Sequence, residues 1–291
     1  MKNTKRGILL ATITMVSLGL VGVVDKFGVS TVSNPLLFSA QSVTFSGLYI
    51  LILSFIYFQS RWISTIHSIR RTHIFLMILI GVFSSGLFIL FRFLGLSESS
   101  GTFATLSQII TTSLTAILAR IFLREKLSKI FWVLFALIIG ATYVSSTGTF
   151  AFTPIKSGDL LILAGTLFLA SSNIISKVVV GSVSPLFVGL FRGISGAVFL
   201  IIISSLFYGF PFTAISPWAA ISGFFWMINI AVFYFAVKDI GVTLPSAILM
   251  IAPVITMVLE HFLLGRDFSP IQITSSLVIV ICGISIIVTK K

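Results

Sequence analysis

Several polar side chains that can bind a small solute stand inside long apolar stretches of this chain. They are the amides Gln41, Gln108, Asn173 and Asn229. A polar side chain is costly in a bilayer, so it tends to face another polar group, water or a bound molecule. For any single amide, a hydrogen bond to a neighbouring helix is the simpler interpretation. Taken together, the amides predict a solute-binding cavity.

Two ionisable residues add charge to this set. Arg192 lies seven residues after Pro185, or about 10 Å into the membrane if the segment is helical. Its side chain either extends to the interface or supplies a positive charge suited to a carboxylate. Glu260 lies near the end of its apolar stretch, where an interfacial ion pair with Arg92 or Arg266 is favoured. The sharper hypothesis is that Glu260 binds a coupling proton.

A weak internal repeat gives Gln108 a partner. The stretch that begins at Leu94 matches the stretch that begins at Phe235 after a shift of 141, which places Leu249 opposite Gln108. Pro253 follows Leu249 by four residues, so it removes the N–H that would bond the Leu249 carbonyl. We therefore expect a helix break near the midplane at Leu249 and Pro253, with hydrogen-bonding groups from both halves at the same depth.

Aromatic residues form the last candidate group. Trp226 and Tyr234, with the phenylalanines beside them, are typical of a pocket for a cation. The chain has 29 phenylalanines, so ordinary core packing is the simpler interpretation of such a cluster. We retain Trp226 and Tyr234 as candidate binding residues.

The composition places these residues in a membrane. Hydrophobic residues make up 57% of the 291 positions, charged residues 9%, and the mean hydropathy is +1.17, whereas soluble domains carry about 25% charged residues. The net charge of +12 comes mostly from Lys and Arg at the ends of apolar runs, so membrane topology explains it better than nucleic-acid binding does. The single cysteine excludes a disulfide framework.

Ten stretches are long and apolar enough to cross a bilayer as helices, because about 20 residues span its core. They are Gly7–Val24, Leu36–Phe58, His73–Phe93, Thr102–Leu123, Ile130–Ser146, Gly158–Ser176, Pro185–Phe207, Pro217–Val237, Val242–Leu264 and Ile271–Val288. In the longest internal connection, Trp62, Ile66 and Ile69 share one face of a short amphipathic helix on the membrane surface.

The distribution of basic residues sets the orientation. With the N-terminus in the cytoplasm, the external side holds only Lys26, Arg92, Lys156 and Arg266, which is the bias that the positive-inside rule requires. We therefore expect a multi-pass plasma-membrane protein with both termini in the cytoplasm.

The expected spans divide into two sets of five. A polar segment at 148–157 acts as an external linker between a first repeat at 1–147 and a second at 158–291. Five is odd, so the second repeat enters the membrane in the opposite sense. Inverted repeats of this kind are typical of secondary transporters, which bind their substrate near the midplane.

The order of these features resembles the EamA family of the drug/metabolite transporter superfamily over the whole chain. The similar motifs are IFLREKLS from Ile121, FLLGRDFS from Phe262, Ala252 with Pro253, Ser184 with Pro185 and Arg192, and the run Phe235–Val237. The second half departs from the family by having Arg266 before Asp267 in its charged turn, and the first half has Thr112 in place of the proline. The resemblance implies ten helices in two inverted repeats and a transporter, often an exporter of metabolites such as amino acids.

We therefore predict a secondary active transporter, a monomer or a homodimer in contact with lipid, that exports a small organic metabolite by alternating access. A proton is the expected coupling ion. We expect no cofactor, metal or nucleic-acid partner, because the three histidines lack metal-binding spacing and no nucleotide-binding loop is present. The alternative is a membrane-embedded protein without transport activity, such as an enzyme or an assembly factor.

Overall fold

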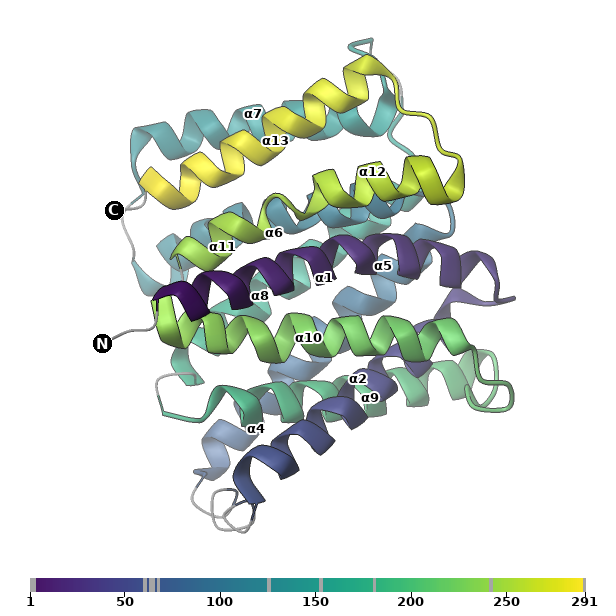
Figure 1. The fold of residues 1–291 in the computed structure, drawn as a ribbon, viewed down its shortest axis with the longest axis vertical. Helices are drawn as coiled ribbons and strands as arrows, with labels where there is room; N and C mark the ends of the chain where they lie inside the picture. Colours follow the sequence, from purple (N-terminus) through teal and green to yellow (C-terminus); the bar gives the residue numbers. More distant parts are fainter. Residues whose placement is uncertain are drawn as a thin grey trace.

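The computed structural model describes residues 4–59, 62, 66, 69–124, 127–151, 154–179, 182–240 and 243–289. These residues form an all-helical bundle without strands. The long helices run side by side, alternating in direction, and both chain termini lie at the same end of the bundle (Figure 1). We call this the terminal end, and the opposite end, where α1 leads into α2, the distal end.

Thirteen helical elements are described. They are α1 (Thr4–Ser30), α2 (Pro35–Phe58), α4 (Arg71–Gly81), η2 (Val82–Leu87), α5 (Phe88–Leu96), α6 (Gly101–Leu123), α7 (Lys129–Thr147), α8 (Ser157–Val179), α9 (Pro185–Phe207), α10 (Pro217–Ile240), α11 (Thr243–Leu249), α12 (Ala252–Leu264) and α13 (Pro270–Thr289).

Local sequence signals set several of the helix ends. The Asn34 side chain accepts a hydrogen bond from the Leu36 N–H at 2.8 Å, and Ser100 accepts one from the Phe103 N–H at 2.9 Å. Such caps satisfy backbone donors that have no partner within the helix. At the other ends of their helices, Gly148 and Gly265 take left-handed conformations with φ of 73° and 61°, which glycine adopts without steric cost.

Two of the expected spans are not regular helices. The third runs from α4 through the π-helical η2 into α5. The ninth is two helices, α11 and α12, because a turn at Met250 and Ile251 interrupts it. Pro253 lies in the first turn of α12, where proline is tolerated.

Seven described helices are long and apolar enough to cross a membrane, and three more apolar helices, at Pro217–Phe233, Ala252–Leu264 and Pro270–Ile286, are shorter. Large apolar side chains such as Phe55, Phe122 and Leu206 remain exposed on the outside of the bundle. An exposed apolar surface of this extent is typical of contact with lipid.

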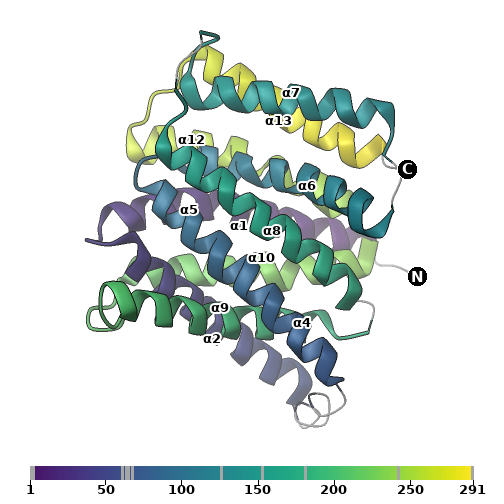
Figure 2. The same ribbon diagram turned by 180° about the vertical axis from the view of Figure 1, so that it is seen from behind.

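The helices are arranged in tiers. The pair α7 and α13 lies at one edge of the bundle, and α2, α4 and α9 lie at the other (Figures 1 and 2). Between these edges α1 packs against α10 on one side and against α11 and α12 on the other. Three buried apolar clusters, centred on Phe93, Ile109 and Phe187, join the tiers.

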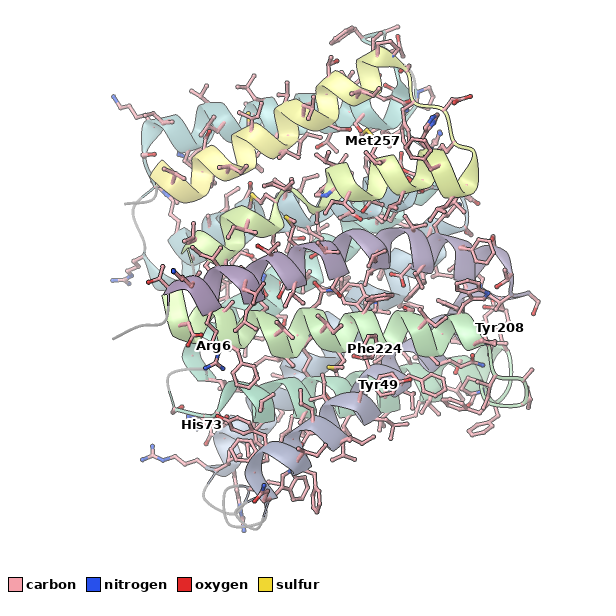
Figure 3. All side chains as sticks on the ribbon, in the orientation of Figure 1. Arg6, Tyr49, His73, Tyr208, Phe224 and Met257 are labelled. Carbon is pink, nitrogen blue, oxygen red and sulfur yellow. The ribbon has the colours of Figure 1, made fainter. Side chains whose placement is uncertain are left out.

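Most of the expected surface helix between Gln59 and Thr72 lies outside the described residues. The three described apolar residues of its predicted face, Trp62, Ile66 and Ile69, pack against the cluster around Phe187. Trp62 Nε1 also donates a hydrogen bond to Ser54 Oγ at 3.2 Å. These contacts tie the segment to the bundle at the terminal end, where Figure 3 also places Arg6 and His73.

Glycine allows the closest helix contacts, as at the crossing of α5 and α8. A Cβ atom on Gly95 would overlap the Gly158 carbonyl oxygen and the Ile162 side chain, whereas one on Gly140 would meet nothing within 4 Å. The crossing of α5 and α8 therefore requires a residue without a side chain at position 95. Position 140 has room for one.

We expect Gly95→Ala to lower the free energy of unfolding by about 1–3 kcal/mol, because overpacking forces neighbouring backbone apart. The matched change Gly140→Ala, also within a helix, should leave stability unchanged or raise it by roughly 0.5–1 kcal/mol. Chemical denaturation in mixed micelles measures both. Equal stability of the two variants would contradict the close approach of α5 and α8.

Candidate functional site

A buried ion pair lies near the distal end of the bundle. Arg92 Nε of α5 lies 3.3 Å from Asp25 Oδ2 of α1, and both side chains are 0% exposed. Each residue is within two turns of the end of its helix, and helical side chains tilt towards the helix N-terminus. Both helices run towards the distal end, so the pair is directed into the bundle.

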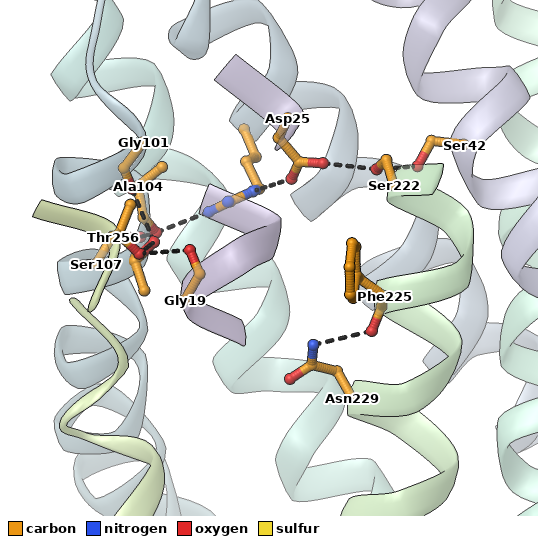
Figure 4. Close-up of polar contacts among 12 residues, drawn as sticks. Gly19, Asp25, Ser42, Gly101, Ala104, Ser107, Ser222, Phe225, Asn229 and Thr256 are labelled. Atoms are coloured by element: carbon orange, nitrogen blue, oxygen red, sulfur yellow. Dashed lines mark hydrogen bonds and ion pairs between the residues drawn. The ribbon is translucent and has the colours of Figure 1, made fainter. Parts of the chain in front are cut away.

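Further hydrogen bonds extend this pair across five helices (Figure 4). Ser222 Oγ of α10 donates to Asp25 Oδ1 at 2.6 Å and lies 2.7 Å from Ser42 Oγ of α2. Arg92 Nη1 donates to the Ala104 carbonyl of α6 at 2.7 Å. The Asp25–Arg92 network therefore joins α1, α2, α5, α6 and α10.

The Asp25–Arg92 network was missed in the sequence. We expected Arg92 on the external side of the membrane, but the sequence did not indicate that its side chain is completely buried. The first span was expected to end at Val24, but α1 continues to Ser30 and so includes Asp25. An acidic residue one position beyond an expected span was the signal that could have revealed it, because a charge there needs a buried partner.

Glu260 has a different partner from the expected one. Its carboxylate accepts hydrogen bonds from the N–H groups of Gly101 and Thr102 at 2.8 and 3.0 Å, and from Thr102 Oγ1 at 2.6 Å. The expected interfacial pair with Arg92 or Arg266 is therefore wrong. Glu260 of α12 instead binds the N-terminus of α6, where unpaired N–H groups and the helix dipole favour an anion.

Contacts beside Glu260 hold α1 against the same two helices. Thr256 Oγ1 of α12 donates to the Gly19 carbonyl of α1 at 2.9 Å and lies 3.2 Å from Thr105 Oγ1 of α6. Gly22 and Gly101 are so close that a Cβ on Gly101 would overlap the Gly22 carbonyl. We call the contacts of Asp25–Arg92, Glu260 and Thr256 the distal latch, because they close α1, α5, α6 and α12 together.

Two further acids at the distal end, Asp159 and Glu98, also bond across elements. Asp159 of α8 accepts hydrogen bonds from Ser99 and Ser146, and Glu98 accepts one from Ser157. Lys26 Nζ donates to the Leu96 carbonyl at 2.6 Å.

The predicted amides do not form one cluster. Gln41 bonds the loop before α10, with Nε2 donating to the Ala214 carbonyl at 2.6 Å and Oε1 accepting from the Ser216 N–H at 2.9 Å. Asn173 donates to Thr115 Oγ1 of α6 at 3.2 Å, and Asn229 donates to Ser17 Oγ of α1 at 3.3 Å. All three therefore link neighbouring elements.

Gln108 and Trp226 differ from these amides. Within the described part of the chain, Gln108 Nε2 and Arg92 Nη2 are buried and have no hydrogen-bond partner. Trp226 Nε1 is also buried, and it is directed towards the Asp25 carboxylate. The Arg92 guanidinium lies over the Trp226 ring, 5.5 Å from its centroid. Gln108 follows Ala104, which binds Arg92, by one turn on the same face of α6.

The remaining candidates lie elsewhere. Arg192 of α9 donates from Nε to Ser85 Oγ of η2 at 3.1 Å. Leu249 is the last residue of α11, and Pro253 is buried two residues after the interruption. The Tyr234 side chain lies outside the described residues.

The fold and this buried polar centre define a multi-pass helical membrane protein. The sequence matches the EamA-like transporter family twice, over residues 5–147 and 156–289. The chain therefore belongs to the EamA-like transporter family and is a membrane transporter of the drug/metabolite type, as the sequence resemblance predicted.

Two further similarities agree with this assignment. The chain is 29% identical over 204 residues to a Bacillus subtilis (strain 168) protein described as the uncharacterized transporter YyaM, and this match covers 66% of each protein. A solved structure described only as a crystal structure of a protein has a TM-score of 0.65 at 16% identity, and the match covers 96% of this chain and 95% of that one. The structural match supports the fold alone.

Removing the Glu260 carboxylate should weaken the distal latch. We expect Glu260→Ala to lower the free energy of unfolding by about 1–3 kcal/mol for each buried donor that it leaves unpaired. Asp267→Ala is the matched control, because the Asp267 side chain at the same end is 95% exposed. Denaturation in mixed micelles compares them, and a loss of equal size in both variants would argue against the cap on α6.

The buried ion pair should behave non-additively. We expect Asp25→Leu or Arg92→Leu alone to cost about 3–5 kcal/mol, since each leaves an uncompensated buried charge. The double variant should cost less than the sum of the two, because it leaves no charge behind. A double-mutant cycle of unfolding free energies measures this coupling, and additive losses would show that the two charges do not interact.

Proposed function

We propose that this protein is a secondary active transporter that moves a small organic solute across the plasma membrane by alternating access. Ten spans in two inverted repeats of five would carry out this exchange, with residues 1–147 and 158–291 as the repeats and 148–157 as the linker. The observation that carries the proposal is a symmetry in the helix packing. If each helix is replaced by its counterpart in the other half, most of the packed helix pairs are again packed pairs.

In this exchange, α1 corresponds to α8, α2 to α9, the α4–α5 span to α10, α6 to α11–α12, and α7 to α13. Helix α1 packs on α10, and its counterpart α8 packs on α4 and α5. Likewise, α6 packs on α8, and their counterparts α11–α12 and α1 pack on each other. The pairs α2–α9, α6–α12 and α7–α13 map onto themselves. This pattern supports a two-fold axis between inverted halves.

The pattern fails for α1 and its counterpart α8, in a way that supports alternation. Helix α1 packs against α2, α5 and α6 of its own half, whereas within the described residues α8 makes no comparable contact with α9, α10, α11 or α12. The contacts of α1 lie in its distal third, where Asp25 meets Arg92, Gly22 meets Gly101 and Gly28 meets Phe38. We infer that the structure is the state closed at the distal end.

The alternate state would reverse this asymmetry. The distal latch would separate, and the part of α8 near the terminal end would close against α9, α10 and α11. The interruption between α11 and α12 and the π-helical turn in η2 are irregular points at which helices bend, so they would absorb this movement. By the positive-inside rule the distal end is external and both termini are cytoplasmic.

The solute and its site are also proposals. Membership of the family supports an amino acid or related metabolite, moved outward. We propose that Gln108 and the Leu249 carbonyl mark the centre of the cavity, with Asn173, Asn229 and Trp226 at its walls and Gln41 and Arg192 towards its ends. Tyr234 stays a candidate from the sequence alone. Either a monomer or a homodimer would perform this exchange.

A pair of single-cysteine reporters tests alternating access without a known substrate. In a Cys282→Ser background, Thr105→Cys places a thiol just inside the distal latch, and Asn173→Cys places one at the repeat equivalent of Gly22. A membrane-impermeant maleimide added from one side of oriented vesicles reports the access of each thiol. We expect Asn173→Cys to react from the terminal side and Thr105→Cys to be protected from the distal side.

Opening the latch should reverse these results. Asp25→Asn or Glu260→Gln should speed distal labelling of Thr105→Cys and slow terminal labelling of Asn173→Cys, whereas the control Asp267→Asn should change neither. Access from both sides at once would indicate a channel, and unchanged labelling in both latch variants would support the non-transport alternative.

The role of Glu260 in proton coupling stays a prediction with its own test. If Glu260 binds the coupling proton, Glu260→Gln should abolish solute flux driven by a pH gradient in proteoliposomes while solute exchange without a gradient continues. Gradient-driven flux at the rate of the unaltered protein would limit Glu260 to its cap on α6.

A further inference from the structure

The turn between α6 and α7 carries exposed positive charge at the terminal end of the bundle. Arg120 lies in the last turn of α6, Arg124 caps the C-terminus of that helix, and Lys129 is the first residue of α7. All three are exposed, and within the described part of the chain none of them forms an ion pair with an acid. We call these three residues the basic turn, and their uncompensated charge attracts an anion.

The repeat equivalent of the basic turn lies at the distal end and lacks its charge. After the shift of 141, the stretch 120–129 matches the stretch 261–270, which joins α12 to α13. The first stretch contains four lysines or arginines and one acid, whereas the second contains one arginine and one acid. The excess of positive charge is therefore not a requirement of the repeated helix–turn unit and is a feature of the turn at the terminal end.

The backbone at Arg124 gives independent support. Arg124 and its equivalent Gly265 both take the left-handed conformation, with φ of 56° and 61°, and their N–H groups bond to the carbonyls of Ala119 and Glu260. This conformation is strained for a residue with a side chain, whereas glycine adopts it freely. The same cap is thus built with glycine at the distal end and with arginine at the terminal end. A strained residue in place of glycine indicates that its side chain has a role other than folding.

Large apolar side chains lie beside the basic turn on the outside of the bundle. Helix α7 lies with α13 at one edge (Figure 1), and basic side chains and tryptophan next to apolar ones are typical of the boundary between lipid tails and headgroups. A nucleic acid or an acidic protein segment would match the charge but leave this apolar surface uncovered, whereas a phospholipid matches both. The exposed apolar residues of this surface are Ile121, Phe122, Ile130, Trp132 and Val133.

We propose that the basic turn binds the phosphate headgroup of an anionic phospholipid, whose acyl chains lie along the exposed apolar face of α7. Clusters of Lys and Arg at the cytoplasmic ends of membrane helices attract the anionic lipids of that leaflet, and the positive-inside rule places the terminal end in the cytoplasm. The bound lipid would join α6 to α7, which packs mainly against α13, and so would stabilise this edge of the bundle. The inference goes beyond the proposed transport function and does not depend on the solute.

The test is a thermal-stability assay of the full chain in detergent, since a ligand that binds only the folded state raises the melting temperature. The probes are dioleoylphosphatidylglycerol, dioleoylphosphatidylcholine, which has the same acyl chains without net charge, and glycerol 3-phosphate, which has the phosphate without the chains. We expect only phosphatidylglycerol to stabilise the protein. High salt should reduce that stabilisation, because it screens exposed charges.

Variants connect the binding to the basic turn. Arg120→Gln and Lys129→Gln should each weaken the binding of phosphatidylglycerol roughly fivefold, the contribution of one basic residue near an anionic membrane surface. Lys5→Gln is the matched control, because it removes one exposed charge from α1 at the same end of the bundle. It should bind phosphatidylglycerol as the unaltered protein does.

Arg124→Gly separates lipid binding from folding. Glycine relieves the left-handed strain, so this variant should melt at a higher temperature than the unaltered protein when no lipid is added. It should nevertheless bind phosphatidylglycerol roughly fivefold more weakly, because it lacks one of the three charges. A variant that had simply lost its fold could not show the first of these effects.

Any of four results would overturn the inference. They are no stabilisation by phosphatidylglycerol, equal stabilisation by phosphatidylcholine or by glycerol 3-phosphate, unweakened binding in both Arg124→Gly and Arg120→Gln, and an equal loss in Lys5→Gln. None of these results contradicts alternating access, which the cysteine reporters test separately.

Discussion

The structure depends on the absence of water from the bilayer core, which requires every buried polar group to find a partner within the protein. The Asp25–Arg92 pair shows this constraint most clearly. Each charge alone would be very costly inside the membrane, and together they draw Ser222, Ser42 and the Ala104 carbonyl into one network. A single ion pair thereby fixes the positions of five helices near the distal end.

The same constraint explains Glu260 and the close glycine contacts around it. The first turn of α6 begins inside the bundle, so its free N–H groups need an acceptor, and the Glu260 carboxylate provides one from α12. Beside this carboxylate, Gly22 and Gly101 allow α1 and α6 to touch. Charge satisfaction and steric fit thus produce one latch that closes the distal end.

A latch made of costly buried charges is also well suited to opening. Within it, Arg92 makes a single contact with Asp25, and Arg92 Nη2 has no partner among the described residues, so another partner can replace this contact without exposing an apolar core. In the proposed exchange of the two halves, α8 would take the place in the second state that α1 has here. Membership of the EamA-like transporter family and this asymmetry support the same account of a carrier with two alternately closed ends.

The sequence by itself determined the class of protein, the helical content and several of the helix ends, because hydrophobicity, helix caps and prolines act over a few neighbouring residues. It also placed Gln108, Trp226 and Pro253 among the residues of interest, since polarity, ring type and backbone chemistry can be seen without a fold. Only the tertiary structure decided the partners: Asp25 and Arg92 are 67 positions apart, and Glu260 and Gly101 are 159 apart. Sequence spacing predicts contacts within a helix but not which helices become neighbours, so the expected pairing of Glu260 with an arginine was wrong and the Asp25–Arg92 pair was found only in the folded chain.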